Sequence, residues 1–257
     1  MREPLNIDAL RAATQLPRID YTAETGSTNA DLVKAALQGA PEWTAAVTDY
    51  QSAGRGRHGR VWTAPPMSQA TMSILIRPST SAVERLGTMP LVTGLALIDA
   101  LSDTYDVALK WPNDVLINGR KVCGILAEVA QFQPEPAIVI GLGLNVSLSE
   151  DELPVPHAIS LEMVGGPVDR TVLVGSVLIA LKERLTQWMN NEPTLMRDYR
   201  AVCSSIGQQV RVHLPGDKEL LGECIGVADD GLIQVQSADA VVHEIAAGDV
   251  VHLRLQQ

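Results

Sequence analysis

The sequence predicts an α/β protein in which a larger mixed domain is followed by a small all-β domain. Between residues 7 and 190, segments with helical periodicity alternate with apolar, strand-like segments. From about residue 204 the helical pattern stops, and short strand-like segments recur about every 8–12 residues. Strands at that spacing favour a small barrel or sandwich. We therefore expect a mixed sheet with flanking helices in residues 1–204 and a β domain in residues 205–257.

Helices and strands alternate along residues 1–204. The helix expected at 29–39 has Ser27 or Thr28 as its N-cap and ends at Gly39. The dipeptide Asn118-Gly119 favours a two-residue type I′ turn, which would join two strands of a hairpin. The expected helices are 7–16, 29–39, 83–102 and 170–190, and the expected strands are 44–50, 71–77, 107–111, 115–117, 121–129 and 137–146.

The second domain is predicted from alternating hydrophobicity. Val210, Val212 and Leu214 alternate with polar residues, which is typical of a strand with one buried face. The sequence Asp-Asp-Gly at 229–231 is typical of a turn. Further strands are expected near 219–227, 231–237, 240–246 and 249–255.

The charge balance argues against binding to nucleic acid or to an anionic membrane. The chain carries 20 Lys+Arg and 30 Asp+Glu, a net charge of −10, whereas such binders need a broad basic field. Its four Trp, four Tyr and one Phe are few for stacking on a run of bases. The most apolar stretches, 137–146 and 171–181, fall short of the roughly 20 residues that a membrane span requires. We expect neither partner.

The cysteines and the first residues predict a cytoplasmic protein. Residues 1–8 lack the apolar segment of a secretory signal. Cys123, Cys203 and Cys224 are isolated and odd in number, which argues against a disulfide framework and against a zinc site. A reducing compartment keeps such thiols free.

Residues 54–60, Gly-Arg-Gly-Arg-His-Gly-Arg, form a Gly/Arg-rich loop after the strand at 44–50. The string matches G-x-G-x-x-G, but a dinucleotide site also needs a helix next, and Pro65 and Pro66 follow instead. Glycine lets the backbone approach a ligand closely, and arginine binds phosphate through two hydrogen bonds. The loop therefore favours an anion pocket for a phosphate-bearing ligand. The alternative is a flexible, solvated surface loop.

Three further segments could contribute to a polar site. Lys110 ends an apolar strand and is followed by Trp-Pro-Asn-Asp, so it could neutralise a carboxylate and a phosphate that approach each other. The alternative there is a rigid turn beside a solvated lysine. Residues 26–30 can be a plain helix N-cap, although a helix N-terminus also offers free N–H groups. Residues 141–145, Gly-Leu-Gly-Leu-Asn, are a weaker signal at a strand end.

Taken together, these segments resemble the biotin–protein ligases. The motifs lie in the family's order, and the set is specific although each motif alone is not. The second domain is similar to the family's SH3-like C-terminal domain, so the resemblance covers essentially the whole chain and implies a small SH3-like β-barrel. The motifs are Ser27-Thr28-Asn29, Gln51-x-x-Gly54-Arg-Gly-Arg-x-Gly-Arg60-x-Trp62, Lys110-Trp-Pro-Asn-Asp114, Lys121-x-x-Gly124-Ile-Leu-x-Glu128 and Gly141-x-Gly-x-Asn145.

The resemblance implies a reaction in two steps. Biotin and ATP form biotinyl-5′-AMP and pyrophosphate, with Mg²⁺ accompanying the triphosphate, and biotin then passes to a lysine of a biotin carboxyl carrier domain of an acyl-CoA or pyruvate carboxylase. Lys110 and Arg57 are the expected catalytic residues, and no metal ligands are assigned. The expected biotin contacts are Ser27, Thr28, Asn29, Gln51, Arg55, Gly56, Arg57 and Lys110, and the expected ATP or adenylate contacts are Arg55, Arg57, Trp62, Asn113 and Asn145.

Other activities remain as alternatives. A lipoate–protein ligase or octanoyl transferase has a related fold, but the Gly/Arg-rich loop and residues 110–114 favour biotin. Family members that are also repressors carry an N-terminal helix-turn-helix domain. Only 26 residues precede Ser27, so we expect the form without DNA binding, as a monomer or homodimer. Departures from the family pattern are few: His58 stands where some relatives have arginine, and Cys123 where alanine is common.

Overall fold

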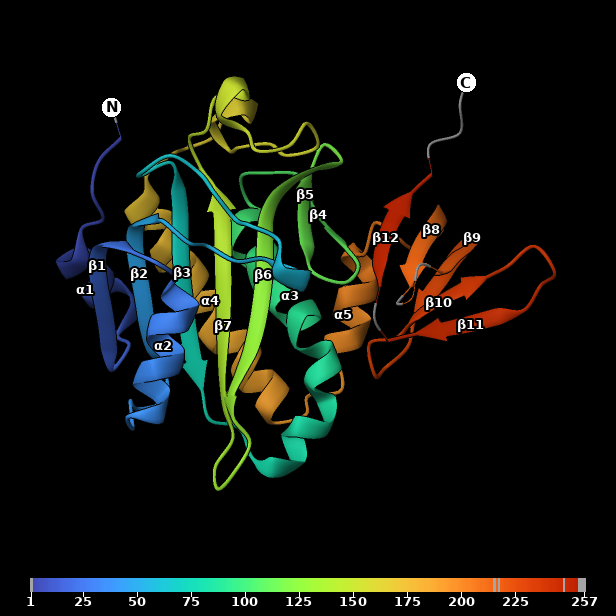
Figure 1. Cartoon of the computed structure of the whole chain (residues 1–257), viewed down its shortest axis with the longest axis horizontal. Coiled ribbons are helices and arrows are strands. Elements are labelled where there is room, and N and C mark those ends of the chain that lie inside the picture. Colours follow the sequence, from blue (N-terminus) through green and yellow to red (C-terminus); the bar gives the residue numbers. More distant parts are fainter. Residues whose placement is uncertain (1, 215, 217, 247, 254–257) are drawn as a thin grey trace.

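The computed structural model describes residues 2–214, 216, 218–246 and 248–253 and contains two sheets (Figure 1). The strands of the larger sheet are β1 (Arg18–Thr25), β2 (Thr44–Gln51), β3 (Gln69–Ile76), β4 (Val107–Lys110), β5 (Asp114–Ile117), β6 (Arg120–Gln131) and β7 (Ala137–Asn145). Their order in the sheet is β1-β2-β3-β7-β6-β5-β4. β1 and β2 are parallel and the other neighbours are antiparallel, so the sheet is mixed, as predicted.

Helices cover both faces of this sheet. On one face, Leu32 and Ala36 of the second helix share a buried cluster with Leu75 and Val139 of the strands. The third and fourth helices pack against each other over the main core on the other face. Figure 1 shows the second helix in front of the sheet and the fourth behind it. The helices are α1 (Ile7–Thr14), α2 (Thr28–Leu37), α3 (Met89–Leu101), α4 (Arg170–Met189) and α5 (Leu195–Val202).

The predicted hairpin turn is confirmed. Asn118 and Gly119 connect β5 to β6 and have φ values of 52° and 71°. Both central residues of a type I′ turn need positive φ, which asparagine and glycine adopt at low cost.

The single helix predicted at 83–102 is wrong in its first part. A 3₁₀ segment at Thr80–Thr88 (η2) precedes α3, which begins at Met89 with Pro90 in its first turn. Proline donates no N–H, and its ring clashes with the carbonyl four residues earlier, so an α-helix does not continue through Pro90 from the N-terminal side.

Two elements have no clear sequence signal. β1 is an edge strand, and most of its side chains are exposed, with Ile19 the buried one. The strand therefore lacks the alternation of a half-buried strand. α5, which buries Leu195, Met196 and Tyr199 over its 8 residues, is also missing from the expected helices.

The second domain is all-β, as predicted. Its strands are β8 (Gln209–Leu214), β9 (Lys218–Val227), β10 (Ile233–Gln236), β11 (Val242–Ile245) and β12 (Asp249–His252). They form an antiparallel sheet in the order β11-β10-β9-β8-β12, and the ladder between β11 and β12 is open within the described residues. Val210, Val212 and Val235 are buried on its inner side. The strand end expected at 254–255 lies outside the described residues.

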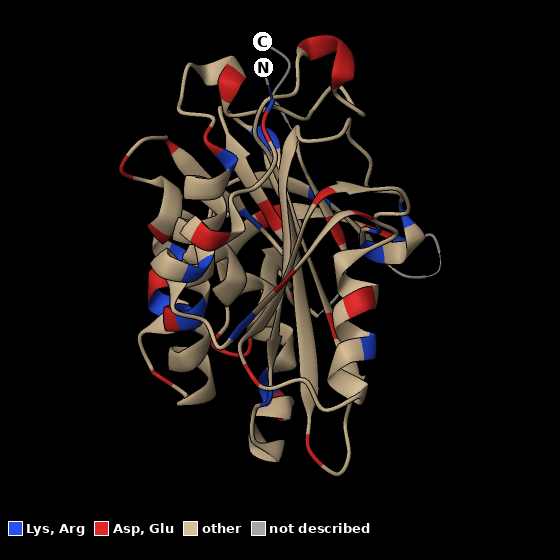
Figure 2. Ribbon diagram, turned by 90° about the vertical axis from the view of Figure 1, so that its left-hand side faces the viewer, with Lys and Arg blue, Asp and Glu red and all other residues tan. Residues whose placement is uncertain are grey.

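Charged residues of both signs are spread over the surface. On the face shown in Figure 2, Lys and Arg are interspersed with Asp and Glu on helices and loops. None of the helices in the described part of the chain combines the length and hydropathy that a membrane crossing requires. The three cysteines are free and buried, and Cys123 is a fully enclosed core residue, as expected.

Candidate active site

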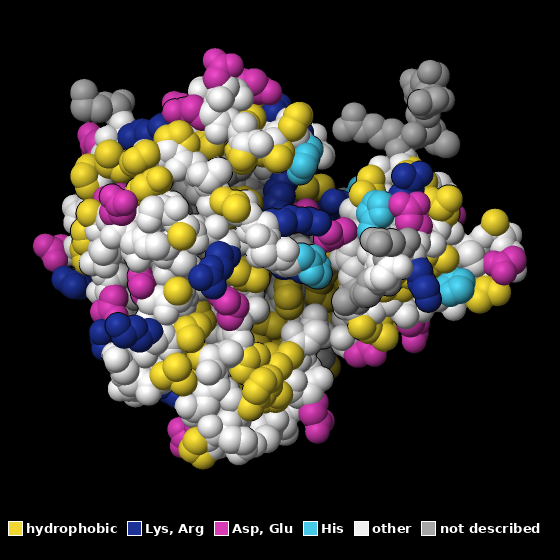
Figure 3. Space-filling model, viewed as in Figure 1, with side chains coloured by type: hydrophobic (Ala, Val, Ile, Leu, Met, Phe, Trp, Pro, Cys, Tyr) yellow, Lys and Arg dark blue, Asp and Glu magenta, His cyan; other side chains and the backbone are white. Residues whose placement is uncertain are grey.

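One cavity brings the predicted site residues together. It has a volume of about 610 Å³, and Lys, Arg and His side chains gather at its edge (Figure 3). β12 of the second domain contributes Asp249, Val250 and Val251, so both domains form its walls. The predicted residues in its lining are Ser27, Thr28, Asn29, Gln51, Arg55, Gly56, Arg57, Trp62, Lys110, Asn113 and Asn145.

The N-terminus of α2 forms one wall. Ser27 is its N-cap, and the Ser27 Oγ accepts a hydrogen bond from Ala30 N at 3.5 Å. Gln51, at the end of β2, accepts from Thr28 N at 2.8 Å and from Thr28 Oγ1 at 3.1 Å. The loop after β2 therefore starts from a fixed position beside the helix terminus.

Asn29 is bonded on both sides of its amide. Its Nδ2 donates to Leu126 O at 3.2 Å and to Glu128 Oε2 at 2.7 Å, and its Oδ1 accepts from Ser73 Oγ at 2.6 Å. Gly141 makes room for it, because a Cβ at that position would overlap Asn29 Oδ1. Asn29 thus ties the start of α2 to β6, and its contact with biotin stays a prediction.

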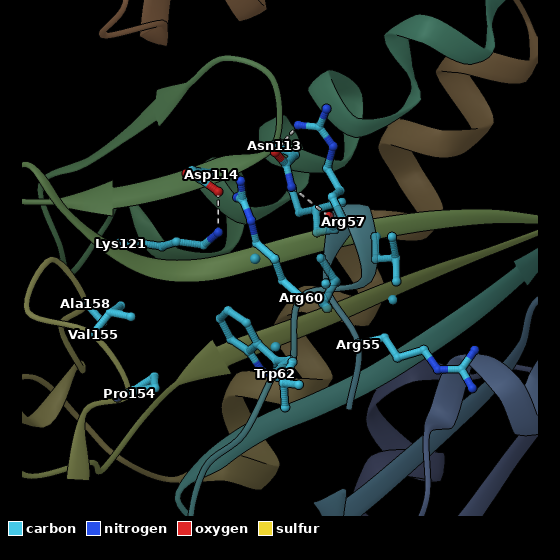
Figure 4. Close-up of a pocket in the computed structure, with 18 of the residues that line it drawn as sticks. Arg55, Arg57, Arg60, Trp62, Asn113, Asp114, Lys121, Pro154, Val155 and Ala158 are labelled. Atoms are coloured by element: carbon cyan, nitrogen blue, oxygen red, sulfur yellow. Dashed lines mark hydrogen bonds and ion pairs between the residues drawn. The ribbon is translucent and has the colours of Figure 1, made fainter. Parts of the chain in front are cut away.

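The Gly/Arg-rich loop borders the cavity, and four of its residues are also exposed to solvent: Arg55, His58, Gly59 and Arg60. A Cβ on Gly54 would overlap the carbonyl oxygen of Trp62, so glycine lets the two ends of the loop meet. Arg57 Nη1 donates to Asn113 Oδ1 at 2.9 Å (Figure 4). Asn113 Nδ2 in turn donates to Ile125 O at 2.9 Å. Arg57 is therefore held by Asn113, which is itself fixed by its hydrogen bond to β6.

The other two arginines of the loop, Arg55 and Arg60, do not share the contact of Arg57 with Asn113. Arg60 forms an ion pair with Asp249, which joins the loop to the second domain. Arg55 is exposed and points away from Lys121 and Trp62 in Figure 4. Its expected contacts with biotin and ATP stay predictions.

Trp62 lies on a floor formed by glycines of two neighbouring strands. A Cβ on Gly143 would overlap the indole, and one on Gly124 would lie 3.0 Å from its Cζ3 atom. Trp62 Nε1 donates to Gln69 Oε1 at 3.1 Å, and Gln69 Nε2 donates to Asn145 Oδ1 at 2.7 Å. The glycines admit the aromatic ring, and the buried amides orient it.

Asn145 holds the Gln69 side chain that orients Trp62. Its side chain is almost fully enclosed, with 1% of the residue exposed. The Asn145 Oδ1 accepts from Gln69, and its Nδ2 donates to Ile159 O at 3.0 Å. Because both ends of the amide are bonded within the protein, the observed position is a supporting one, and contact with the adenylate stays a prediction.

Asp114 holds two lysines in the cavity wall. It forms an ion pair with Lys121, and its Oδ2 lies 3.8 Å from Lys110 Nζ. Lys121 Nζ also lies over the Trp62 ring, 5.7 Å from its centre. Burial lowers the pKa of Lys110, and the Asp114 carboxylate acts in the opposite direction. The cluster places two ammonium groups beside an aromatic surface.

Sequence reasoning missed several members of this site. Lys121 lies in one of the motifs, but the motif alone assigns it no role. Its spacing to Gly124, which admits Trp62, is the signal that could have revealed it. Gln69 and Asp249 carry no local signal, because only the fold brings them to the cavity.

Comparison with known proteins identifies the family of the chain. A model described as "Biotin/lipoate A/B protein ligase family" matches residues 21–145, and one described as "Biotin protein ligase C terminal domain" matches residues 205–253. The biotin--[acetyl-CoA-carboxylase] ligase of Mycobacterium tuberculosis is 40% identical over 99% of this chain and 98% of its own length. The chain belongs to the biotin–protein ligase family.

Two further proteins place this ligase among its relatives. The bifunctional ligase/repressor BirA of Bacillus subtilis is 28% identical over 86% of this chain and 70% of its own length. The biotin protein ligase from Aquifex aeolicus, solved in complex with biotin and ATP, is 26% identical, with a TM-score of 0.78 over 93% of this chain and 100% of that chain. The predicted family, fold class and enzyme class of this biotin–protein ligase are thereby confirmed.

Proposed function

We propose that this ligase forms biotinyl-5′-AMP from biotin and ATP in the cavity and then passes biotin to a lysine of a biotin carboxyl carrier domain. The observation that carries the proposal is the convergence of Arg57, Lys110 and Lys121 on one cavity. A carboxylate and a triphosphate repel each other, so their reaction requires cations that are already positioned where the two anions meet.

The wall at α2 supports the biotin site. Ser27, Thr28 and Gln51 offer hydroxyl and amide groups there, beside Asn29 and the backbone at Gly56. Such groups suit a small, polar ring of the ureido type, which needs both donors and acceptors. The carboxylate of the same ligand would then extend toward the lysines.

The Trp62 floor supports the nucleotide site. An aromatic surface stacks with a base, and the neighbouring Asn113 offers a polar side chain at the cavity. Mg²⁺ would neutralise the triphosphate when bound. The carboxylates in the described lining, Asp114 and Asp249, are already paired with Lys121 and Arg60, so phosphate oxygens would be the main ligands of the ion. The described residues contain no cluster of three or more candidate ligands, which fits an ion bound largely through phosphate.

In the first step, an oxygen of the biotin carboxylate attacks the α-phosphorus. A new P–O bond forms, and the bond to pyrophosphate breaks with its electron pair leaving on pyrophosphate. Lys110 and Arg57, with Lys121 as an added participant, neutralise the charge that the two anions bring together. In the second step, the uncharged amine of the carrier lysine attacks the biotinyl carbonyl carbon, loses a proton and displaces AMP.

The choice between biotin and lipoate is open to a direct test, since the matching family model includes both kinds of ligase. The protein is incubated with ATP, Mg²⁺ and either biotin or lipoate, and acyl-adenylates are detected by mass spectrometry. We expect biotinyl-5′-AMP. Detection of lipoyl-adenylate alone would overturn the proposal in favour of a lipoate–protein ligase.

The role of Lys110 is tested by Lys110→Ala. Removing one positioned charge typically costs about 10²–10³ in rate, so we expect single-turnover adenylate formation to slow by about 10²-fold or more. Lys121→Ala shows how the task is shared between the two lysines, and Lys34→Ala, an exposed lysine of α2, is the matched control. A wild-type rate for Lys110→Ala would contradict the proposed role.

Further parts of the proposal concern partners, domains and location. We place the domain boundary at 204/205, supported by the second family match, which begins at residue 205. The partners are carrier domains of acyl-CoA or pyruvate carboxylases, supported by the name of the Mycobacterium tuberculosis relative. The free cysteines suit the reducing cytoplasm. Transfer of biotin to purified carrier domains of each carboxylase class, detected with streptavidin, tests the partners.

A further inference from the structure

His252, on β12 of the second domain, is bonded to the strand end that carries Lys110. The His252 Nε2 atom lies 3.0 Å from Ser205 Oγ, and the same Oγ accepts a hydrogen bond from Trp111 N at 3.2 Å. Ser205 is fully buried. A continuous chain of hydrogen bonds therefore runs from the last described strand to the peptide that joins Lys110 to Trp111.

The Ser205 hydroxyl can serve both of its neighbours at once. Its oxygen accepts from Trp111 N, and the hydroxyl can either donate to His252 Nε2 or accept from it, because it has one hydrogen and two lone pairs. Either tautomer of a neutral imidazole fits this arrangement. Burial lowers the pKa of His252, and the positive charge of Lys110 lowers it further, which also favours the neutral form.

Three more hydrogen bonds hold residues 109–111 from the same side. Ser204 donates to Leu109 O twice, from its backbone N at 2.7 Å and from its Oγ at 2.9 Å. Trp111 Nε1 donates to Gly231 O at 3.0 Å. Residues 109–111 are thus held by groups that follow residue 203.

The position of β4 explains why such contacts are needed. β4 is the edge strand of the larger sheet and pairs along its length only with β5 within the described residues. Beyond a bridge between Leu109 and Cys203, the sheet itself does not fix the outer side of this strand. An ammonium group at the end of an edge strand needs external support if it is to stay where the anions meet.

We propose that His252 is a positioning residue that acts through Ser205 and the backbone of Trp111 to fix the place of Lys110. The inference rests on the proposed role of Lys110 in adenylate formation. The second domain then contributes to the first chemical step through a residue that bonds to Ser205 and lies outside the described lining of the cavity.

The test compares His252→Leu with His252→Gln, whose side-chain oxygen can still accept from Ser205. The matched control is His243→Leu, because His243 Nε2 lies 3.1 Å from Ser237 Oγ in a similar pair within the same domain. We expect His252→Leu to slow single-turnover adenylate formation at saturating biotin and ATP about tenfold or more, with unchanged biotin affinity. His252→Gln should stay within about threefold of the wild type and His243→Leu at the wild-type rate.

A double-mutant cycle separates positioning from general damage. In the Lys110→Ala background, His252→Leu should cause no further loss, because the group that it positions is gone. An equal loss in both backgrounds, or a wild-type rate for His252→Leu, would overturn the inference while leaving the role of Lys110 intact. A wild-type rate for Lys110→Ala alone would overturn both. If His252→Leu does not fold, as judged by its thermal unfolding, loss of activity in a folded His252→Gln would decide against the inference.

Discussion

The indole of Trp62 occupies the space that a side chain on Gly143 would fill. A Cβ on Gly143 would lie less than 3.0 Å from the indole nitrogen. β7, which carries this glycine, is paired with β3 on one side and β6 on the other, so its backbone cannot move away. The proposed nucleotide surface therefore depends on the absence of a single methyl group.

Gly143→Ala should displace the indole and weaken ATP binding. Stacking of a base on an aromatic side chain is worth about 1–3 kcal/mol, so we expect KM for ATP to rise about tenfold or more. The Kd for biotin, measured by calorimetry, should change little, because the wall at α2 is not affected. Gly175→Ala is the control, since its Cβ would make only ordinary contacts, with Leu10 at 3.7 Å and Ala13 at 4.0 Å. Equal losses for both ligands would indicate collapse of the whole cavity instead.

Arg57→Gly should let the adenylate escape. Arg57 fastens the loop to Asn113, and without this bond the loop no longer covers the mixed anhydride. A hydrogen bond to a charged group contributes a net stabilisation of about 1.5–3 kcal/mol. Dissociation of biotinyl-5′-AMP should therefore accelerate about tenfold or more. A chase with unlabelled biotin measures the rate. Asn113→Ala removes the other partner and should give a similar leak, and an unchanged rate in Arg57→Gly would show that the loop does not retain the intermediate.

The rate of adenylate formation should fall at alkaline pH. Burial lowers the pKa of Lys110 below its usual value, so the ammonium form is lost at a lower pH than for an ordinary lysine. Since the ammonium is the neutralising species, the rate holds below this pKa and declines as the pH rises through it. Lys110→Arg stays charged and should lack this decline. The profile is measured in single turnovers from about pH 7 to 10, below the usual titration of lysine. Identical profiles for the two proteins would contradict the assignment.

The ion pair between Arg60 and Asp249 should help to position the Gly/Arg-rich loop but contribute little to the free energy of unfolding. The Arg60 side chain is 65% exposed, and exposed pairs contribute about 1 kcal/mol or less. Asp249→Arg should therefore lower Tm by no more than a few degrees. KM for ATP should rise, because like charges push the loop from the second domain. Combining it with Arg60→Asp restores the attraction and should recover much of KM. A double variant no better than Asp249→Arg would mean that the pair does not position the loop.

Local sequence patterns predicted elements that depend on the backbone preferences of their own residues. The helix at α2 is marked by its Ser27 cap, and the β5–β6 turn by Asn118-Gly119, because each depends on the residue's own backbone chemistry. β1 escaped prediction because an exposed edge strand has no buried face to impose alternation. Its place next to β2 follows from the fold as a whole.

The same distinction holds for the site. The residues that the motifs assign to catalysis, biotin or ATP all lie in the lining of the cavity, whereas other motif residues such as Gly54 and Glu128 do not. Gln69 and Asp249 were not named, because a buried amide beneath Trp62 and an acid from the second domain become site residues only through tertiary packing. Lys121 is intermediate: its motif was noticed, but only the structure shows it between Asp114 and the indole.

Two glycines of β7 also limit how an enzyme of this kind can evolve toward another acyl group. Gly141 lies against Asn29 and Gly143 against Trp62, on a central strand with partners on both sides, so any larger residue there only removes space. The loop at 53–62 and the segment at 154–157 border the same cavity and can change in length without breaking the central strand pairs. New substrate ranges should therefore arise through insertions and replacements in these borders, while the two glycines are inherited unchanged.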